Sequence, residues 1–189
     1  MTTHLSQTKP AATSSSCEES AWQQEMKQAI RSSLGLCEFL KIPPTAINVE
    51  ENDFPVFVPR SFAARMNPGD PADPLLLQVI AQSQESLPIE GYEKDPNGEA
   101  TAVLAAGVLR KYSSRALMIT SGACAVHCRY CFRRHYPYSD SPSGLQQWQS
   151  SLQAIAQDTN IEEVILSGGD PLVLSDQSIG QLLSALADI

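Results

Sequence analysis

The sequence lacks any long apolar run. Although 42% of its 189 residues are hydrophobic, no apolar stretch approaches the roughly 20 residues that a membrane-spanning helix requires. Residues 1–7 also lack the charged start and apolar centre of a secretory signal. We therefore predict a soluble, cytosolic protein that has no membrane partner.

Positive charge is scarce. Lys and Arg total 13 against 21 Asp and Glu, which gives a net charge of -8 and an isoelectric point near 4.8. Such a chain repels phosphate backbones at long range, so nucleic acid is excluded as a partner. The length and the charged fraction of 18% fit one ordinary globular domain, or a piece of one.

A second pair of closely spaced cysteines is also absent. Cys124, Cys128 and Cys131 share one short loop, whereas Cys17 and Cys37 lie far from it and are predicted to be buried or incidental thiols. In a reducing cytosol, spaced cysteines bind metal or do chemistry more often than they form disulfides. Three thiolates can hold three irons of a 4Fe-4S cubane and leave the fourth iron open.

The open iron decides which chemistry the spacing favours. It can be chelated by the amino and carboxylate groups of S-adenosyl-L-methionine, whose reductive cleavage releases a 5'-deoxyadenosyl radical. A zinc site completed by His127 or His135 is the alternative. Zinc ribbons generally use pairs of C-x-x-C knuckles, so the sequence favours the iron-sulfur cluster.

The order of the predicted elements indicates an α/β fold. The residue pattern predicts a tail over 1–17 and a helical region over 18–108, with helices within 18–42 and near 61–66 and 75–82. From 109 onward it predicts strands at 115–120 and 162–167 that alternate with helices at 145–157 and after the N-cap Ser175. Alternation of this kind predicts parallel strands joined by crossover helices, here the first two βα units of a partial (β/α) barrel.

Two motifs adjoin the predicted strand ends. Ser167, Gly168, Gly169 and Asp170 follow the second strand, where catalytic loops of a barrel gather and where glycine lets the backbone approach a ligand. Arg133 is part of a basic cluster directly after the cysteines. A guanidinium fork matches a carboxylate, so we predict that Arg133 holds an amino-acid substrate rather than serving as a solvated loop charge.

These motifs resemble the radical S-adenosylmethionine lysine 2,3-aminomutase family. The string CAVHCRYCFRRHYP begins at Cys124, and SGGDPL begins at Ser167; segments 58–62, 67–75 and 109–115 strengthen the likeness. The resemblance covers roughly residues 54–174 and is greatest to the member that makes β-lysine for modifying elongation factor P.

The resemblance implies a fold, a reaction and a set of cofactors. Pyridoxal 5'-phosphate would hold the lysine α-amino group as an imine, and the adenosyl radical would start its migration to the β-carbon. The Gly-Gly-Asp motif would bind the methionine amino group, and a flavodoxin or ferredoxin would supply the low-potential electron. The cofactor-facing positions would be Tyr130, beside the adenine, and Lys111, Tyr112 and Arg115, near pyridoxal phosphate; loop packing and strand entry are their structural alternatives.

The resemblance also carries an expectation about length. The imine-forming lysine and the acidic residues that recognise the substrate ammonium lie in a C-terminal half of the family, which has no counterpart up to Ile189. We therefore expect a truncated piece that holds a cluster but does not turn over lysine alone. Two alternatives stay open: an aminomutase for another amino acid, such as glutamate, and a non-catalytic zinc-binding module.

Overall fold

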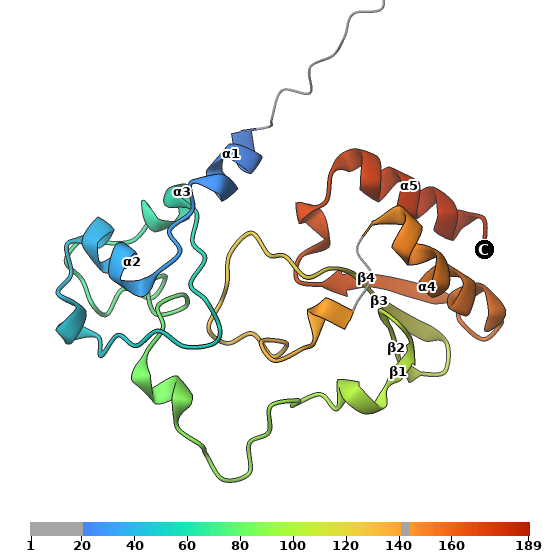
Figure 1. The fold of residues 1–189 in the computed structure, drawn as a ribbon, viewed down its shortest axis with the longest axis horizontal. Coiled ribbons are helices and arrows are strands. Elements are labelled where there is room, and N and C mark those ends of the chain that lie inside the picture. The colour runs from blue at the N-terminus through green and yellow to red at the C-terminus, as the bar shows by residue number, and fades with distance from the viewer. Residues whose placement is uncertain (1–20, 141–143) are drawn as a thin grey trace, which may run out of the picture.

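The computed structural model describes residues 21–140 and 144–189. The predicted tail over 1–17 lies outside the described residues. Figure 1 shows an N-terminal half made of short helices and turns beside a C-terminal half in which helices pack on a sheet. Each half has its own hydrophobic core. Within the described ranges, no helix is long and apolar enough to cross a bilayer.

The N-terminal half contains two helices within 18–42, where one or two were predicted. They are α1 (Ala21–Lys27) and α2 (Ser33–Leu40). The side chain of Ser32 caps α2 by accepting the N–H of Gly35, and Lys41 ends the helix in the left-handed conformation. The third helix, α3 (Arg60–Ala63), is one short turn at the predicted place. Cys37 lies in the core of this half, 1% exposed, as predicted.

The helix predicted at 75–82 is wrong. This segment forms a run of turns, although its residues Leu76, Val79 and Ile80 are buried as a helix face would be. The carboxylate of Asp73 accepts the N–H groups of Leu75 and Leu76 as an N-cap would, but the β-branched residues Val79 and Ile80 that follow weaken helix propensity. The chain then becomes extended, where Gln82 forms an antiparallel bridge with Val49.

The C-terminal half contains a four-stranded sheet in the order β1-β2-β3-β4. The predicted strands are β3 (Arg115–Ser121) and β4 (Glu163–Gly168), which pair in parallel from Arg115↔Glu163 to Ser121↔Gly168. The crossover is α4 (Leu145–Gln157), and α5 (Asp176–Ala187) follows β4 with Ser175 as its N-cap. The predicted strand-helix-strand-helix order is therefore confirmed.

The sheet also holds an antiparallel hairpin that the sequence analysis missed. It consists of β1 (Val103–Ala105) and β2 (Val108–Tyr112), and β2 pairs antiparallel with β3. Gly107 makes the tight connection with a positive φ of 72°. The sheet thus begins inside the range predicted as helical, because two very short strands leave too little alternation to detect.

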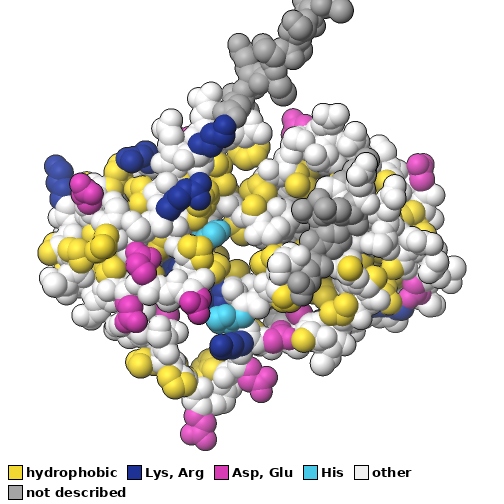
Figure 2. All heavy atoms as spheres, viewed as in Figure 1, with side chains coloured by type: hydrophobic (Ala, Val, Ile, Leu, Met, Phe, Trp, Pro, Cys, Tyr) yellow, Lys and Arg dark blue, Asp and Glu magenta, His cyan; other side chains and the backbone are white. Residues whose placement is uncertain are grey.

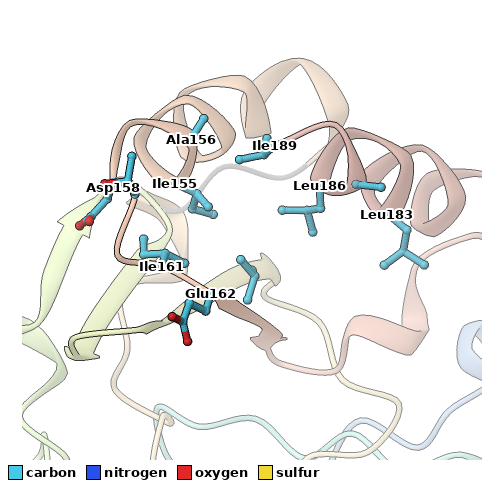
Figure 3. Close-up of a pocket in the computed structure, with 11 residues that line it drawn as sticks. Ile155, Ala156, Asp158, Ile161, Glu162, Leu183, Leu186 and Ile189 are labelled. Atoms are coloured by element: carbon cyan, nitrogen blue, oxygen red, sulfur yellow. The ribbon is translucent and has the colours of Figure 1, made fainter.

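The helices α4 and α5 pack on one another and on the sheet (Figure 1). Trp148 of α4 and Leu182 of α5 are fully buried there, with Met118 of β3. At one end of this layer a groove of about 610 Å³ lies between α4, β4 and α5. Figure 3 shows its mostly apolar lining, with Ile155, Leu183 and Leu186 pointing into it.

Candidate cluster and substrate site

The cysteine loop, residues 122–137, follows β3 and forms hydrogen bonds with the N-terminal half. Its three thiols are half-buried, and the N–H of Cys131 donates to the carbonyl of Cys128 over 3.2 Å. Among the described residues, no group of three His, Cys, Asp or Glu side chains is arranged to hold a single metal ion. Thiolates on different irons of a cubane lie further apart than the ligands of one zinc, so this observation does not exclude an iron-sulfur cluster.

The thiols influence one another electrostatically. Burial is the main cause that raises the pKa of the Cys124 thiol to about 11, and the nearby Cys131, Asp170 and Cys128 contribute to this rise. Burial and Cys131 also raise the pKa of Cys128, although the Arg129 guanidinium opposes this effect. Three thiolates this close repel each other unless a cation compensates them. The donor set, sulfur on one loop with mutually repelling charges, therefore fits a cationic iron-sulfur cluster.

The glycine pair lies against the cysteine loop. A Cβ on Gly168, whose φ is 129°, would lie 2.2 Å from the carbonyl oxygen of Ser121. One on Gly169 would lie 2.2 Å from the carbonyl oxygen of Ala123 and 3.0 Å from the Cys124 sulfur. Only glycine fits either position, so the end of β4 can approach the first cysteine.

Backbone hydrogen bonds hold that approach. The N–H of Gly169 donates to the carbonyl of Ser121, and that of Asp170 donates to the carbonyl of Ala123, each over 2.7 Å. The Asp170 carboxylate accepts the N–H of Leu172 and so caps the short 3-10 helix η5 (Pro171–Val173). The structure thus brings Gly168, Gly169 and Asp170 close to Cys124. Their contact with S-adenosylmethionine stays a prediction.

Arg133 is buried and fully engaged. Its guanidinium is 5% exposed and makes a bidentate pair with Glu99, with Nη2–Oε1 2.7 Å and Nε–Oε2 2.9 Å. Its Nη1 donates to the Ser167 hydroxyl over 2.6 Å. Glu99 was not predicted from the sequence, because it lies 34 residues away in the 3-10 helix η3 (Glu99–Thr101). The predicted contact between Arg133 and a substrate carboxylate stays a prediction.

A cavity of about 440 Å³ lies beside the Arg133–Glu99 pair. Phe132, His135 and Tyr136 of the cysteine loop line it, opposite Val103 of β1. Its volume is in the range of small-molecule sites. Sequence reasoning also missed Tyr138, whose side chain packs against Gly122; burial is the main cause that raises its pKa, and it interacts electrostatically with Cys124 and Cys131.

The other predicted cofactor residues lie apart from this cavity. Tyr130 is 70% exposed, and its hydroxyl contacts the Gln78 side chain over 3.3 Å. Lys111 donates to the carbonyl of Asn97, Tyr112 is 67% exposed, and Arg115 pairs with Glu163. None of these contacts tests the predicted cofactor roles, which stay predictions.

Lys111, Tyr112 and Arg115 share the hairpin end of the sheet. Tyr112 lies opposite Arg115 in the register of β2 and β3. Six residues of extended chain, about 20 Å, separate Arg115 from the cysteine-loop end of β3. The structure does not bring them to the cysteines. Their contact with pyridoxal phosphate therefore has no geometrical support within residues 21–140 and 144–189 and stays a prediction.

The cysteine loop also contacts the N-terminal half. The N–H of His127 donates to the carbonyl of Phe57 over 3.0 Å, and that of Arg129 donates to the carbonyl of Gln78 over 2.7 Å. Arg129 and Arg134 both pair with Glu85. Figure 2 shows that the molecular face is hollowed between the halves, with histidine side chains, in cyan, beside the hollow.

Comparisons with known proteins agree with the cluster assignment. Residues 111–188 match the model of a 4Fe-4S single cluster domain. The chain is 39% identical over 175 residues to the L-lysine 2,3-aminomutase of Haemophilus influenzae, and 44% identical over 136 residues to that of Escherichia coli. It is 28% identical over 129 residues to the enzyme of Clostridium subterminale.

The alignments cover most of this chain and a smaller share of the relatives. They cover 91% of this chain and 52% of the H. influenzae protein, and 72% of this chain and 40% of the E. coli protein. The chain thus spans about half the length of the relatives it matches. The cysteine motif, the glycine pair beside it and these identities together place the chain in the radical S-adenosylmethionine lysine 2,3-aminomutase family.

Proposed function

We propose that this chain provides the cluster-binding part of an isomerase that moves the α-amino group of lysine to the β-carbon. The main observation is the packing of the glycine pair against Cys124, because it places a strand-end backbone beside the first of three thiols on one loop. When bound there, the cluster with S-adenosylmethionine would supply the radical that abstracts hydrogen. The parallel strands β3 and β4 would be the first two of a partial barrel.

The residues of the chain have distinct roles in this proposal. Cys124, Cys128 and Cys131 hold the cluster. Gly168 and Gly169 keep side chains away from it, and the backbone beside them binds the methionine part of S-adenosylmethionine. Tyr130 contacts the adenine. A flavodoxin or ferredoxin donates the electron, and the reaction takes place in the cytosol.

Arg133 binds the substrate carboxylate in this proposal. Its Nε and Nη2 groups donate to Glu99, so a substrate carboxylate would replace Glu99 in the guanidinium fork. The adjoining cavity of about 440 Å³ gives the rest of the substrate room. The exchange keeps the buried guanidinium paired, and the displaced Glu99 carboxylate would turn toward solvent or take up a proton, because a buried unpaired charge is unfavourable.

The remaining roles depend on the relatives. Pyridoxal phosphate is proposed as the group that carries the substrate amino group, without assigned contacts in this chain. The product would be the β-lysine used to modify elongation factor P. Because the chain spans about half of its relatives, we propose that residues 1–189 alone hold a cluster and do not isomerise lysine.

The test compares residues 1–189 with the complete protein. Both are reconstituted anaerobically with iron and sulfide, reduced, and incubated with S-adenosylmethionine, pyridoxal phosphate and either lysine or glutamate. We expect a reduced-cluster paramagnetic signal that S-adenosylmethionine perturbs in both, and β-lysine from the complete protein only. Bound zinc without iron-sulfur absorbance would refute the cluster. Formation of β-glutamate without β-lysine would show that glutamate, not lysine, is the substrate. Formation of β-lysine by residues 1–189 would refute the proposal that this piece is inactive.

A further inference from the structure

Cys128 is attached to the N-terminal half on both sides. The preceding residue, His127, donates its backbone N–H to Phe57, and its Nδ1 lies 2.9 Å from the carbonyl oxygen of Pro55. The following residue, Arg129, donates its backbone N–H to Gln78. The position of the Cys128 sulfur therefore depends on the N-terminal half, although none of the three loop cysteines belongs to that half.

The Arg129 side chain strengthens this attachment. Its guanidinium is 6% exposed, and it donates to Glu85 through Nε (2.9 Å) and Nη2 (2.5 Å) and to the carbonyl of Phe54 through Nη1 (2.7 Å). Nη2 also donates to Asn52 over 2.9 Å, and the cation stacks on the Phe54 ring at 5.0 Å. Lysine has no planar fork and cannot reproduce this set of bonds.

Cys124 is held by the other half of the molecule. The N–H of Ala123 donates to the Ser121 hydroxyl over 3.0 Å, and the carbonyl of Ala123 accepts the N–H of Asp170 at the end of β4. These partners belong to the sheet, whose core is separate from that of the N-terminal half. The distance between the first and second thiols is thus set by how the two halves dock.

We infer that Arg129 is a positioning residue, which sets the spacing of the cluster thiolates by fixing the cysteine loop to the N-terminal half through Glu85. The inference rests on the proposed cluster, but its consequence is measurable without iron. In metal-free protein, the loop around Cys128 and Cys131 should become more accessible when the Arg129–Glu85 bonds are weakened.

The test measures alkylation rates of single thiols in the metal-free complete protein by mass spectrometry. We compare the wild type with Arg129→Lys and with the milder Glu85→Gln. Loss of one charge-assisted hydrogen bond should raise the rates at Cys128 and Cys131 about tenfold, and the rate at Cys124 much less. Cys37, 1% exposed in the N-terminal core, reports global unfolding and should stay unreactive.

Arg115→Lys is the matched control, because it weakens an exposed ion pair with Glu163 at the opposite end of β3. It should leave all four rates unchanged. Unchanged rates at Cys128 in both variants would overturn the inference. Equal acceleration at Cys37 in both would also overturn it, because the pair would then stabilise the whole half rather than position the loop.

A second measurement separates this inference from the proposed function. After anaerobic reconstitution, the variants should release iron to a chelator about tenfold faster than the wild type, with an altered paramagnetic spectrum. If even the wild type assembles no cluster, the proposed function fails while the thiol rates still test the positioning role. Wild-type release rates in both variants would count against the positioning role alone.

Discussion

Gly169 lies so close to the cysteine loop that a side chain has no room there. Its neighbours are the backbone of Ala123 and the sulfur of Cys124, and backbone cannot move aside as the end of a flexible side chain can. Glycine at position 169 therefore lets the chain just past β4 pack directly against the cysteine loop.

Gly169→Ala should reduce the iron bound after reconstitution severalfold, because the new methyl group would displace Cys124. Gly180→Ala is the control: Gly180 lies within α5, and a Cβ there meets nothing within 4 Å. This control should keep its iron and raise the free energy of unfolding by about 0.5–1 kcal/mol. Equal iron contents for the two variants would contradict the proposed closeness of Gly169 to the cluster.

At the scale of elements, the turn over residues 67–76 depends on one carboxylate. Asp73 is 2% exposed and accepts the N–H groups of Asn67, Leu75 and Leu76. The bond from Asn67 is the largest cause that lowers the Asp73 pKa below its ordinary value, and burial opposes it. The ionised carboxylate thus stabilises the turn that buries Leu76.

The lowered pKa predicts how stability changes with pH. A carboxyl group whose folded pKa is lowered stabilises the fold above its unfolded pKa, about 3.9, and this stability is lost as the pH falls through the folded value. Asp73→Asn should therefore lower the melting temperature by a few degrees at pH 7. The difference from the wild type should shrink below about pH 4, as melting curves by circular dichroism at each pH can show; a constant difference would argue against the carboxylate.

Elements with a strong local pattern were predicted well. The strand β3 was predicted within a residue of its bounds from a continuous apolar run, and the helix α4 from apolar residues that repeat on one face. The helix at 75–82 was wrong because the segment runs through turns into extended chain, where Gln82 bridges Val49. That partner lies more than thirty residues earlier, so no local pattern could indicate it.

The site shows the same division. Cys124, Cys128 and Cys131 were found because their spacing is itself the signal. The carboxylates Glu85 and Glu99 were missed because each meets its arginine across more than thirty residues of sequence. No fixed spacing in the sequence indicates which acidic residue will pair with a distant arginine, so these ion pairs can be found only from the fold.

At the scale of the whole molecule, the cysteine loop couples two separate cores. Any group bound by all three thiols must favour the docked arrangement, since binding to the folded form alone stabilises it by mass action. Cluster loading should therefore slow amide hydrogen exchange in residues 52–58 and 78–85, which hold no cluster cysteine. We expect about tenfold slower exchange, equivalent to about 1.4 kcal/mol of coupling.

Hydrogen exchange followed by mass spectrometry on the iron-loaded and iron-free protein can measure this effect. The hairpin β1–β2 is the internal reference, because it lies on the far side of β3 from β4. Protection confined to the cysteine loop would show that the two halves fold independently of the cluster.

The position of β4 in the sheet has a consequence for handling the protein. As the last strand in the order β1-β2-β3-β4, it has one side without a strand partner in the described part of the chain, and Ile165 is 39% exposed on it. Free strand sides of this kind recruit strands from other molecules and lead to aggregation. For preparations of residues 1–189, low protein concentration and a charged substitution at Ile165 should limit such aggregation.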